Sequence, residues 1–190
     1  MRIHAGAFRG RSIKTVEGPG YRPATAKVRE AAFNMLSARG LTFEGLRVAD
    51  LFAGSGSLGI ETLSRGAEFA LFVEMNRKAA SMLRENLRTL GVEPARYRIE
   101  AKDLFSVLKA KPNEAFGLIF IDPPYGHELL KPALQLASGS AWAAPGALIL
   151  AEVEASLDLK DLESLPRLAL ETDRCYGQTR ILLWRTTDPA

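Results

Sequence analysis

The fold is decided by the stretch from residue 47 to residue 59, which reads RVADLFAGSGSLG. Its first half is a short apolar run typical of a buried strand, and its second half contains Gly54, Gly56 and Gly59. This G-x-G-x-x-G spacing after a strand predicts a tight turn that opens a helix and lets a ligand approach backbone N–H groups closely. Nicotinamide dinucleotides use the same turn, so the glycines alone do not select a cofactor.

Acidic residues at successive strand ends favour S-adenosylmethionine as the cofactor. Asp50 lies four residues before the first glycine, where it would repel a pyrophosphate but suit the amino group of a methionine moiety. Glu74 can accept both ribose hydroxyls, and Asp103 can accept the adenine amino group. A helix or turn cap at Asp50 and an ordinary surface position at Glu74 are the alternatives. We expect the cofactor to contact Asp50, Phe52, Ala53, Gly54, Ser55, Gly56, Glu74, Met75, Asp103 and Leu104.

The sequence around this stretch alternates between strand-like and helix-like segments. Such alternation predicts an α/β fold with a mostly parallel sheet that helices cover on both faces. Two further strand-like segments near the end of the sequence are joined by a short glycine-containing turn, which predicts a closing antiparallel hairpin. The expected strands are 47–52, 69–73, 97–100, 116–121, 147–153, 168–174 and 179–185, and the expected helices after residue 47 are about 58–66, 76–91, 103–109 and 127–137.

The segment Asp122-Pro123-Pro124-Tyr125 follows the strand at 116–121, so it also belongs at the carboxyl edge of the sheet. The Asp122 carboxylate and the Pro123 carbonyl can accept both N–H bonds of an exocyclic amino group and localise its lone pair for methylation. Consecutive prolines hold these acceptors rigidly because their φ is fixed. Tyr125 offers a face on which a base can stack, worth ~1–3 kcal/mol. We predict that Asp122, Pro123 and Tyr125 are catalytic; the alternative is a strand-to-helix loop in which Asp122 caps the helix.

Composition and charge describe one globular domain with a basic N-terminal arm. The chain has 190 residues, 47% of them hydrophobic, and residues 1–30 carry seven basic and two acidic side chains although the net charge of the chain is only +3. This asymmetry predicts a polyanionic partner, with a solvated charged surface as the alternative. We expect a hairpin and a helix within 1–40, packed on or extending from a methyltransferase domain at 41–190. The expected phosphate contacts are Arg9, Arg11, Arg22 and Arg29.

Cysteine and histidine usage predicts neither a disulfide nor a metal site. Cys175 is the single cysteine, which suits a reducing cytoplasm, and His4 and His127 lack the spacing of metal ligands. No apolar run approaches the ~20 residues that span a bilayer, and arginines interrupt any run that resembles a signal peptide. We therefore expect a cytoplasmic monomer without metal or membrane contact.

Several motifs spread over nearly the whole chain belong together: Met1-Arg2-Ile3, Ala5-Gly6, Arg9-Gly10-Arg11, Arg22-Pro23, Val28–Leu36 (VREAAFNML), Asp50–Gly56 (DLFAGSG), Leu58-Gly59, Glu61, Ser64–Ala67 (SRGA), Val73-Glu74, Asp122–Tyr125 (DPPY) and Tyr176-Gly177. With these motifs the chain resembles the bacterial 16S rRNA guanine-N2 methyltransferases of the RsmD type. Among the motifs that carry this resemblance, those at the N-terminus are the most specific.

This resemblance implies a seven-stranded, Rossmann-like class I methyltransferase fold that binds S-adenosylmethionine near Asp50, Gly54, Gly56, Glu74 and Asp103. It also implies that Asp122 to Tyr125 surround guanine 966 of 16S rRNA, within a partly assembled small ribosomal subunit. Family members commonly read Arg-Pro-Thr where this chain has Arg22-Pro23-Ala24. Thr25 is therefore left either to replace that hydroxyl near the cofactor or to cap the following helix.

Other functions are compatible with parts of the sequence. An adenine-N6 methyltransferase of RNA or DNA would use the same Asp-Pro-Pro-Tyr segment, although 190 residues leave little room for a separate DNA-recognition domain. A noncatalytic RNA-binding assembly factor could retain the fold, but the intact Asp122 and glycine turn weigh against it. A dinucleotide oxidoreductase is disfavoured by Asp50 and by the prolines.

Overall fold

The computed structural model of the protein describes residues 1–15, 25–124, 128–139, 141–160, 162 and 165–187. Arg22, Tyr125 and His127 lie outside these described residues. Of the helices in the described ranges, none combines the length and the apolar character that crossing a bilayer requires.

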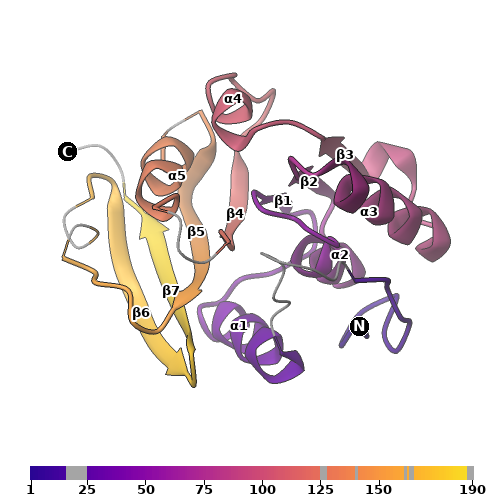
Figure 1. The fold of residues 1–190 in the computed structure, drawn as a ribbon, viewed down its shortest axis with the longest axis horizontal. Helices are drawn as coiled ribbons and strands as arrows, with labels where there is room; N and C mark the ends of the chain where they lie inside the picture. Colours follow the sequence, from indigo (N-terminus) through magenta and orange to yellow (C-terminus); the bar gives the residue numbers. More distant parts are fainter. Residues whose placement is uncertain (16–24, 125–127, 140, 161, 163–164, 188–190) are drawn as a thin grey trace.

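A seven-stranded sheet forms the centre of the described structure, with the strand order β3-β2-β1-β4-β5-β7-β6 (Figure 1). Neighbouring strands from β3 to β5 run parallel, whereas β7 runs antiparallel to both β5 and β6. The predicted α/β fold, a mostly parallel sheet with a closing antiparallel hairpin, is confirmed. The strands are β1 Arg47–Asp50, β2 Phe69–Val73, β3 Tyr97–Glu100, β4 Phe116–Ile121, β5 Ala143–Glu154, β6 Leu168–Tyr176 and β7 Thr179–Thr186.

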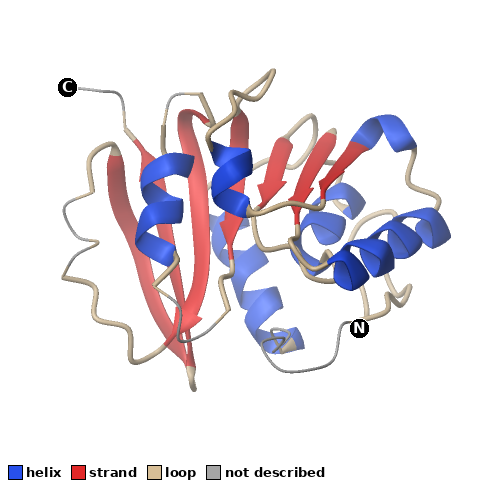
Figure 2. Ribbon diagram, turned by 45° about the horizontal axis from the view of Figure 1, so that its top comes forward, coloured by secondary structure: helices blue, strands red, loops and turns tan. Residues whose placement is uncertain are grey.

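Helices cover both faces of this sheet (Figure 2). Alternate strand residues enter two separate hydrophobic clusters; Val48 belongs to the first, for example, and Ala49 to the second. Helices α1, α2 and α3 close the first cluster, and α4 and α5 close the second. Burial on both faces explains why these strands read as continuous apolar runs. The helices are α1 Ala26–Ala38, α2 Ser57–Ser64, α3 Arg77–Leu90, α4 Leu104–Leu108 and α5 Leu130–Ala137, with a 3-10 turn, η1, at Pro94–Arg96.

Capping side chains determine where two of the helices begin. The Asn76 side-chain oxygen accepts the backbone N–H groups two and three residues later, at 2.9 and 3.2 Å, and so starts α3. Thr25 caps α1, because its hydroxyl accepts the backbone N–H of Val28 at 3.3 Å. Of the two roles open to Thr25, the helix cap is the one observed.

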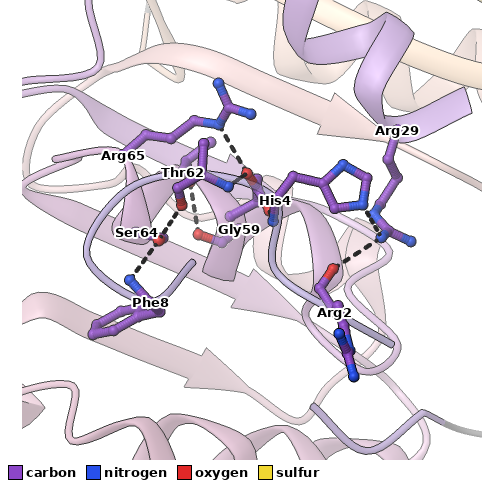
Figure 3. A network of polar contacts seen from close by, with 10 residues as sticks. Arg2, His4, Phe8, Arg29, Gly59, Thr62, Ser64 and Arg65 are labelled. Carbon is purple, nitrogen blue, oxygen red and sulfur yellow. Dashed lines mark hydrogen bonds and ion pairs between the residues drawn. The ribbon is translucent and has the colours of Figure 1, made fainter. Parts of the chain in front are cut away.

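The N-terminal residues 1–15 fold back as a hairpin that packs on α2 (Figure 3). The buried Glu61 carboxylate of α2 accepts two successive backbone N–H groups of this hairpin, at 2.8 and 3.0 Å. Gly6 makes the closest approach, since a Cβ there would lie 1.7 Å from the carbonyl oxygen of Ser64. Backbone contacts therefore hold the hairpin against the helix, and a side chain at Gly6 would force it away.

The largest difference from the predicted strand bounds lies at the start of β5. A start of β5 at residue 147 is expected because Pro145 and Gly146 are poor strand formers. In the structure the pairing of β4 with β5 shifts register between Phe116 and Leu118, and this irregularity lets β5 begin at Ala143. Beyond the irregularity, β5 stays in register with β4 toward the carboxyl edge of the sheet.

Candidate active site

The strand ends that the sequence analysis singled out meet at one edge of the sheet. The carboxyl ends of β1 and β4 are neighbours, with Asp50 paired to Phe120. The chain continues from β1 to β2 on one side and from β4 to β5 on the other. In open α/β sheets, ligands bind where the strand order reverses in this way. We call the ends of β1, β2 and β3 the cofactor side and the ends of β4 and β5 the target side.

The glycine turn after β1 is held in place from two directions. Gly56 precedes α2 with a φ of 83°, and its N–H donates to the carbonyl oxygen of Ala53 at 2.7 Å. A Cβ at Gly56 would lie 2.2 Å from Leu83 Cδ1, so conformation and packing both require glycine. From α3, the Asn86 amide donates to the carbonyl oxygen of Ser55 at 3.1 Å. The protein alone therefore fixes the shape of this turn.

Asp50 lies at the end of β1 and is only 2% exposed. Its Oδ2 accepts the backbone N–H of Gly59 at 3.1 Å, so the cap that the sequence allowed is present. Burial raises the pKa of Asp50 to about 7, the Gly59 N–H opposes this rise, and the nearby Glu74 carboxylate adds to it. No cation among the described residues offsets the rise. The position therefore suits a positively charged ligand group.

Glu74 follows β2 and holds the start of the glycine turn. Its Oε2 accepts the Gly54 N–H at 2.9 Å, and its Oε1 accepts the Asn76 N–H at 2.7 Å. Each carboxylate oxygen has a second lone pair, so Glu74 can also accept ribose hydroxyls. Met75, the next residue, is 70% exposed. It therefore offers an apolar surface at the same edge.

The outermost cofactor candidates lie around the start of α4. Asp103 caps this helix, because its Oδ2 accepts the backbone N–H of Ser106 at 2.8 Å and the hydroxyl of the same residue at 2.9 Å. These bonds hold the pKa of Asp103 below its ordinary value. Leu104 is buried in the second cluster, and Phe52 packs partly against that cluster. Asp103 remains exposed, so an amino group can still reach its carboxylate.

Asp122 and Pro123 follow β4 directly. Asp122 is partly exposed, and within the described part of the chain its carboxylate accepts no hydrogen bond. Burial, Glu152 and Asp50, in that order, raise the pKa of the Asp122 carboxyl well above its ordinary value. Helix α5 begins only at Leu130, so Asp122 does not cap it. The carboxylate is therefore available to a ligand.

Sequence reasoning missed one acidic residue of this edge, Glu152 of β5. Ile121 and Ala151 are paired between β4 and β5, which puts Glu152 beside Asp122, and Glu152 is only 5% exposed. Burial raises the pKa of Glu152 to about 7, although the charge of Arg29 lowers it. A signal for this residue was present, since Glu152 interrupts the otherwise apolar run of residues 147–153.

The arginines that the sequence suggested as phosphate contacts are placed very differently. Arg9 is exposed on the N-terminal hairpin. Arg11 donates to the carbonyl oxygen of Leu90 at 2.9 Å and also to that of Thr89, so it caps the end of α3. Of these two arginines, only Arg9 has a guanidinium that is not used by the fold.

Arg29 does not have the expected placement, because it is buried with only 4% of its surface exposed. Its Nη2 donates to the Arg2 carbonyl oxygen at 3.2 Å and to His4 Nε2 at 3.0 Å (Figure 3). A guanidinium has no acceptor, so His4 Nε2 is the acceptor in this contact. Burial lowers the pKa of Arg29, whereas Glu61 and Glu152 raise it. Arg29 is an internal cation and cannot reach an RNA phosphate.

The acidic residues at the sheet edge do not amount to a metal site. Among the described residues, no group of three or more histidine, cysteine, aspartate or glutamate side chains is arranged to hold a metal ion. Cys175 is exposed on β6, in the closing hairpin.

Comparisons with known proteins agree with this geometry. A family model described as "Conserved hypothetical protein 95" matches residues 1–185. The chain is 38% identical to YlbH of Bacillus subtilis over 187 residues, which cover 97% of this chain and 98% of the relative. It is 34% identical to ribosomal RNA small subunit methyltransferase D of Escherichia coli K12 over 185 residues, covering 97% and 89%.

Solved structures show the same fold. The structure of yhhF from Escherichia coli matches with a TM-score of 0.83 and 31% identity, covering 98% of both chains. An RNA methyltransferase from Salinibacter ruber, solved with S-adenosyl-L-homocysteine, matches with a TM-score of 0.64 and 16% identity, covering 89% of this chain and 96% of that one. The fold is that of S-adenosylmethionine-dependent methyltransferases. Because the family model and both relatives span nearly the whole chain, the protein belongs to the RsmD family.

Proposed function

We propose that this protein transfers a methyl group from S-adenosylmethionine to the exocyclic N2 amino group of a guanine in 16S rRNA. By family resemblance the target is guanine 966, within an assembly intermediate of the small ribosomal subunit. The observation that carries the proposal is the position of Asp122. It directly follows β4, the neighbour of β1, and its carboxylate accepts no hydrogen bond from the described residues.

The chemistry of this step depends on the lone pair of the amino nitrogen, which is delocalised into the guanine ring. The Asp122 carboxylate and the Pro123 carbonyl oxygen can accept its two N–H bonds, draw the nitrogen toward tetrahedral geometry and localise the lone pair. S-adenosylmethionine supplies a methyl group on positive sulfur, so alignment matters more than a strong base. As the nitrogen gains the methyl group it loses a proton, and we expect the Asp122 carboxylate to accept this proton.

The cofactor side has the chemistry that this methyl donor requires. Asp50 is buried, and no cation of the described residues offsets the rise in its pKa, which suits the amino group of the methionine moiety. Glu74 already orders the glycine turn, and a carboxylate has four acceptor sites, so it can also accept ribose hydroxyls. Asp103 is exposed beyond β3, where it can accept the adenine amino group.

For the RNA backbone we propose Arg9 as a phosphate contact, because its guanidinium is exposed. Arg22, outside the described residues, is retained from the sequence as a second candidate. Arg11 and Arg29 are omitted because their guanidinium groups bind carbonyl oxygens within the protein.

The test is labelled methyl transfer to naked 16S rRNA, to small subunits from cells that lack the endogenous enzyme, and to DNA. Nucleosides from each product are then identified. We expect N2-methylguanosine, with the label in ribosomal RNA and none in DNA. Recovery of N6-methyladenosine would show that the protein is an adenine-N6 methyltransferase instead. Absence of transfer to all three substrates would favour a noncatalytic assembly factor.

A further inference from the structure

Glu152 and Glu61 are both deeply buried glutamates, but their carboxylates differ in the hydrogen bonds that they accept. The Glu61 carboxylate accepts two backbone N–H groups and the Arg65 Nε–H, the last at 2.9 Å. Glu152 is almost equally buried, yet none of the hydrogen bonds of the described residues reaches its carboxylate. Arg29 acts on it as a neighbouring charge. A buried carboxylate without hydrogen bonds is unfavourable, so a ligand that donates them is the expected partner.

The sheet register directs Glu152 and Asp122 to the same place. Ile121 and Ala151 are paired and both enter the second cluster. Because side chains alternate along a strand, the next residues on both strands face the opposite side of the sheet, toward α1. Glu152 also acts electrostatically on Asp122, which agrees with this placement. Two carboxylates without hydrogen bonds from the described residues therefore lie side by side on the target side.

Guanine and adenine present different edges to such a pair. On guanine, the N2 amino group and the N1–H are adjacent donors, whereas adenine has an unprotonated N1 beside its N6 amino group. A carboxylate next to the one that binds the amino group can accept the N1–H of guanine, but it would repel the N1 lone pair of adenine. We propose that Glu152 accepts the N1–H of the target guanine and thereby selects guanine over adenine, an inference that rests on the proposed function.

Arg29 completes this arrangement from α1. It is buried rather than exposed, and its charge favours the ionised form of Glu152 against burial, which raises the pKa of Glu152 to about 7. The guanidinium is itself tied to the hairpin through the Arg2 carbonyl oxygen and His4. In this role Arg29 is a positioning residue that does not touch the base.

The experiment compares two target bases in the same RNA. 16S rRNA is assembled by ligation with either guanine or 2-aminopurine at the target position and reconstituted into small subunits. 2-Aminopurine keeps the N2 amino group but has no N1–H. We measure kcat/KM for the native protein, for Glu152→Gln and for the matched control Glu154→Gln, which changes the same residue type two positions further along β5.

We expect the native protein to prefer guanine over 2-aminopurine by about 10- to 100-fold, the size of one good base contact. Glu152→Gln should lose most of this factor on guanine and little or none on 2-aminopurine, because the glutamine amide can donate to the unprotonated N1. Glu154→Gln should leave the preference unchanged. Thermal unfolding and cofactor binding by calorimetry confirm that each variant is folded.

Each other outcome has a distinct meaning. If the native protein methylates guanine and Glu152→Gln lowers transfer to both bases equally, Glu152 is structural or a proton acceptor and the inference is wrong. If the variant leaves both rates unchanged, the inference is wrong as well. If the native protein transfers no methyl group to guanine, the proposed function itself fails.

Discussion

The two sides of the ligand-binding edge treat their acidic side chains in opposite ways. On the cofactor side, Asp50, Glu74 and Asp103 each accept at least one backbone N–H. On the target side, Asp122 and Glu152 accept none from the described residues. The cofactor side is therefore held in shape by the protein itself. The two carboxylates of the target side receive no such donors from the described residues, and a bound base can supply them. One part of the sheet edge is thus preorganised, and the other is suited to recognising a ligand.

The largest expected effect comes from removing the acceptor on the target side. Asp122→Ala should lower kcat for methyl transfer by about 10³-fold, because a group aimed at the reacting atoms is lost. The affinity for S-adenosylmethionine should not change, since the glycine turn is held by contacts that do not involve Asp122. Radiolabel incorporation and calorimetry measure the two quantities, with the exposed Asp158→Ala as control. A parallel loss of cofactor affinity would show that the two sides are not independent.

Glu61 provides the contrasting case of a carboxylate that the protein satisfies fully. Glu61→Gln should destabilise the protein by about 2–3 kcal/mol, because an amide cannot accept all of the donors that now bind the carboxylate. Chemical denaturation at neutral pH measures the free energy of unfolding. An unchanged midpoint would mean that the N-terminal hairpin contributes little to the folded state.

At Glu152, the change from glutamate to glutamine should stabilise the protein at high pH instead of destabilising it. Its pKa is about 7 in the folded protein and near 4.5 when unfolded, so folding takes up a proton between these values. Stability without ligand should therefore fall as pH rises from about 4.5 to 7, and the loss should be complete above pH 7. Glu152→Gln should raise the free energy of unfolding at pH 8 by about 2 kcal/mol and have little effect at pH 4.5. Denaturation at both pH values checks this, and destabilisation at pH 8 would contradict it.

The smallest expected effect extends the comparison to the arginines of the hairpin. Arg9→Ala should reduce the slope of log binding constant against log salt by about one, because one phosphate contact is lost. Arg11→Ala should instead lower the melting temperature, since its guanidinium caps α3. RNA binding at several salt concentrations and thermal unfolding distinguish the two. An unchanged slope for Arg9→Ala would mean that Arg9 contacts no phosphate and is only a solubilising surface charge.

Local patterns were enough to predict most of the fold. The bounds of β2 and β4 agree with the prediction because both are continuous apolar runs that end at an acidic residue, Glu74 and Asp122. Asn76 and Gly91 marked the two ends of α3 in the sequence, and the structure places the helix between them. The longer β5 was not predictable, because its first part depends on pairing with β4 across an irregular register.

The site was harder to read because burial depends on partners far away in the sequence. The contact between Arg11 and Leu90 joins residues 79 positions apart, so no local pattern could indicate it. Arg29 did carry a signal, since Phe33 lies one helical turn later and is fully buried on the same face of α1. The sequence also held a signal for Glu152, because a charged residue stands within an apolar strand. Both were overlooked because basic and acidic residues are usually exposed.

The position of β7 has a consequence for the nascent chain. β7 is the last of the strands in sequence, yet it lies between β5 and β6 and pairs with β5 along most of that strand. Until Thr179–Thr186 has emerged from the ribosome, the outer edge of the strand that carries Glu152 has no neighbour. The strands of the cofactor side, β1 to β3, therefore leave the ribosome early, whereas the edge of β5 on the target side is covered only by the last strand of the described residues.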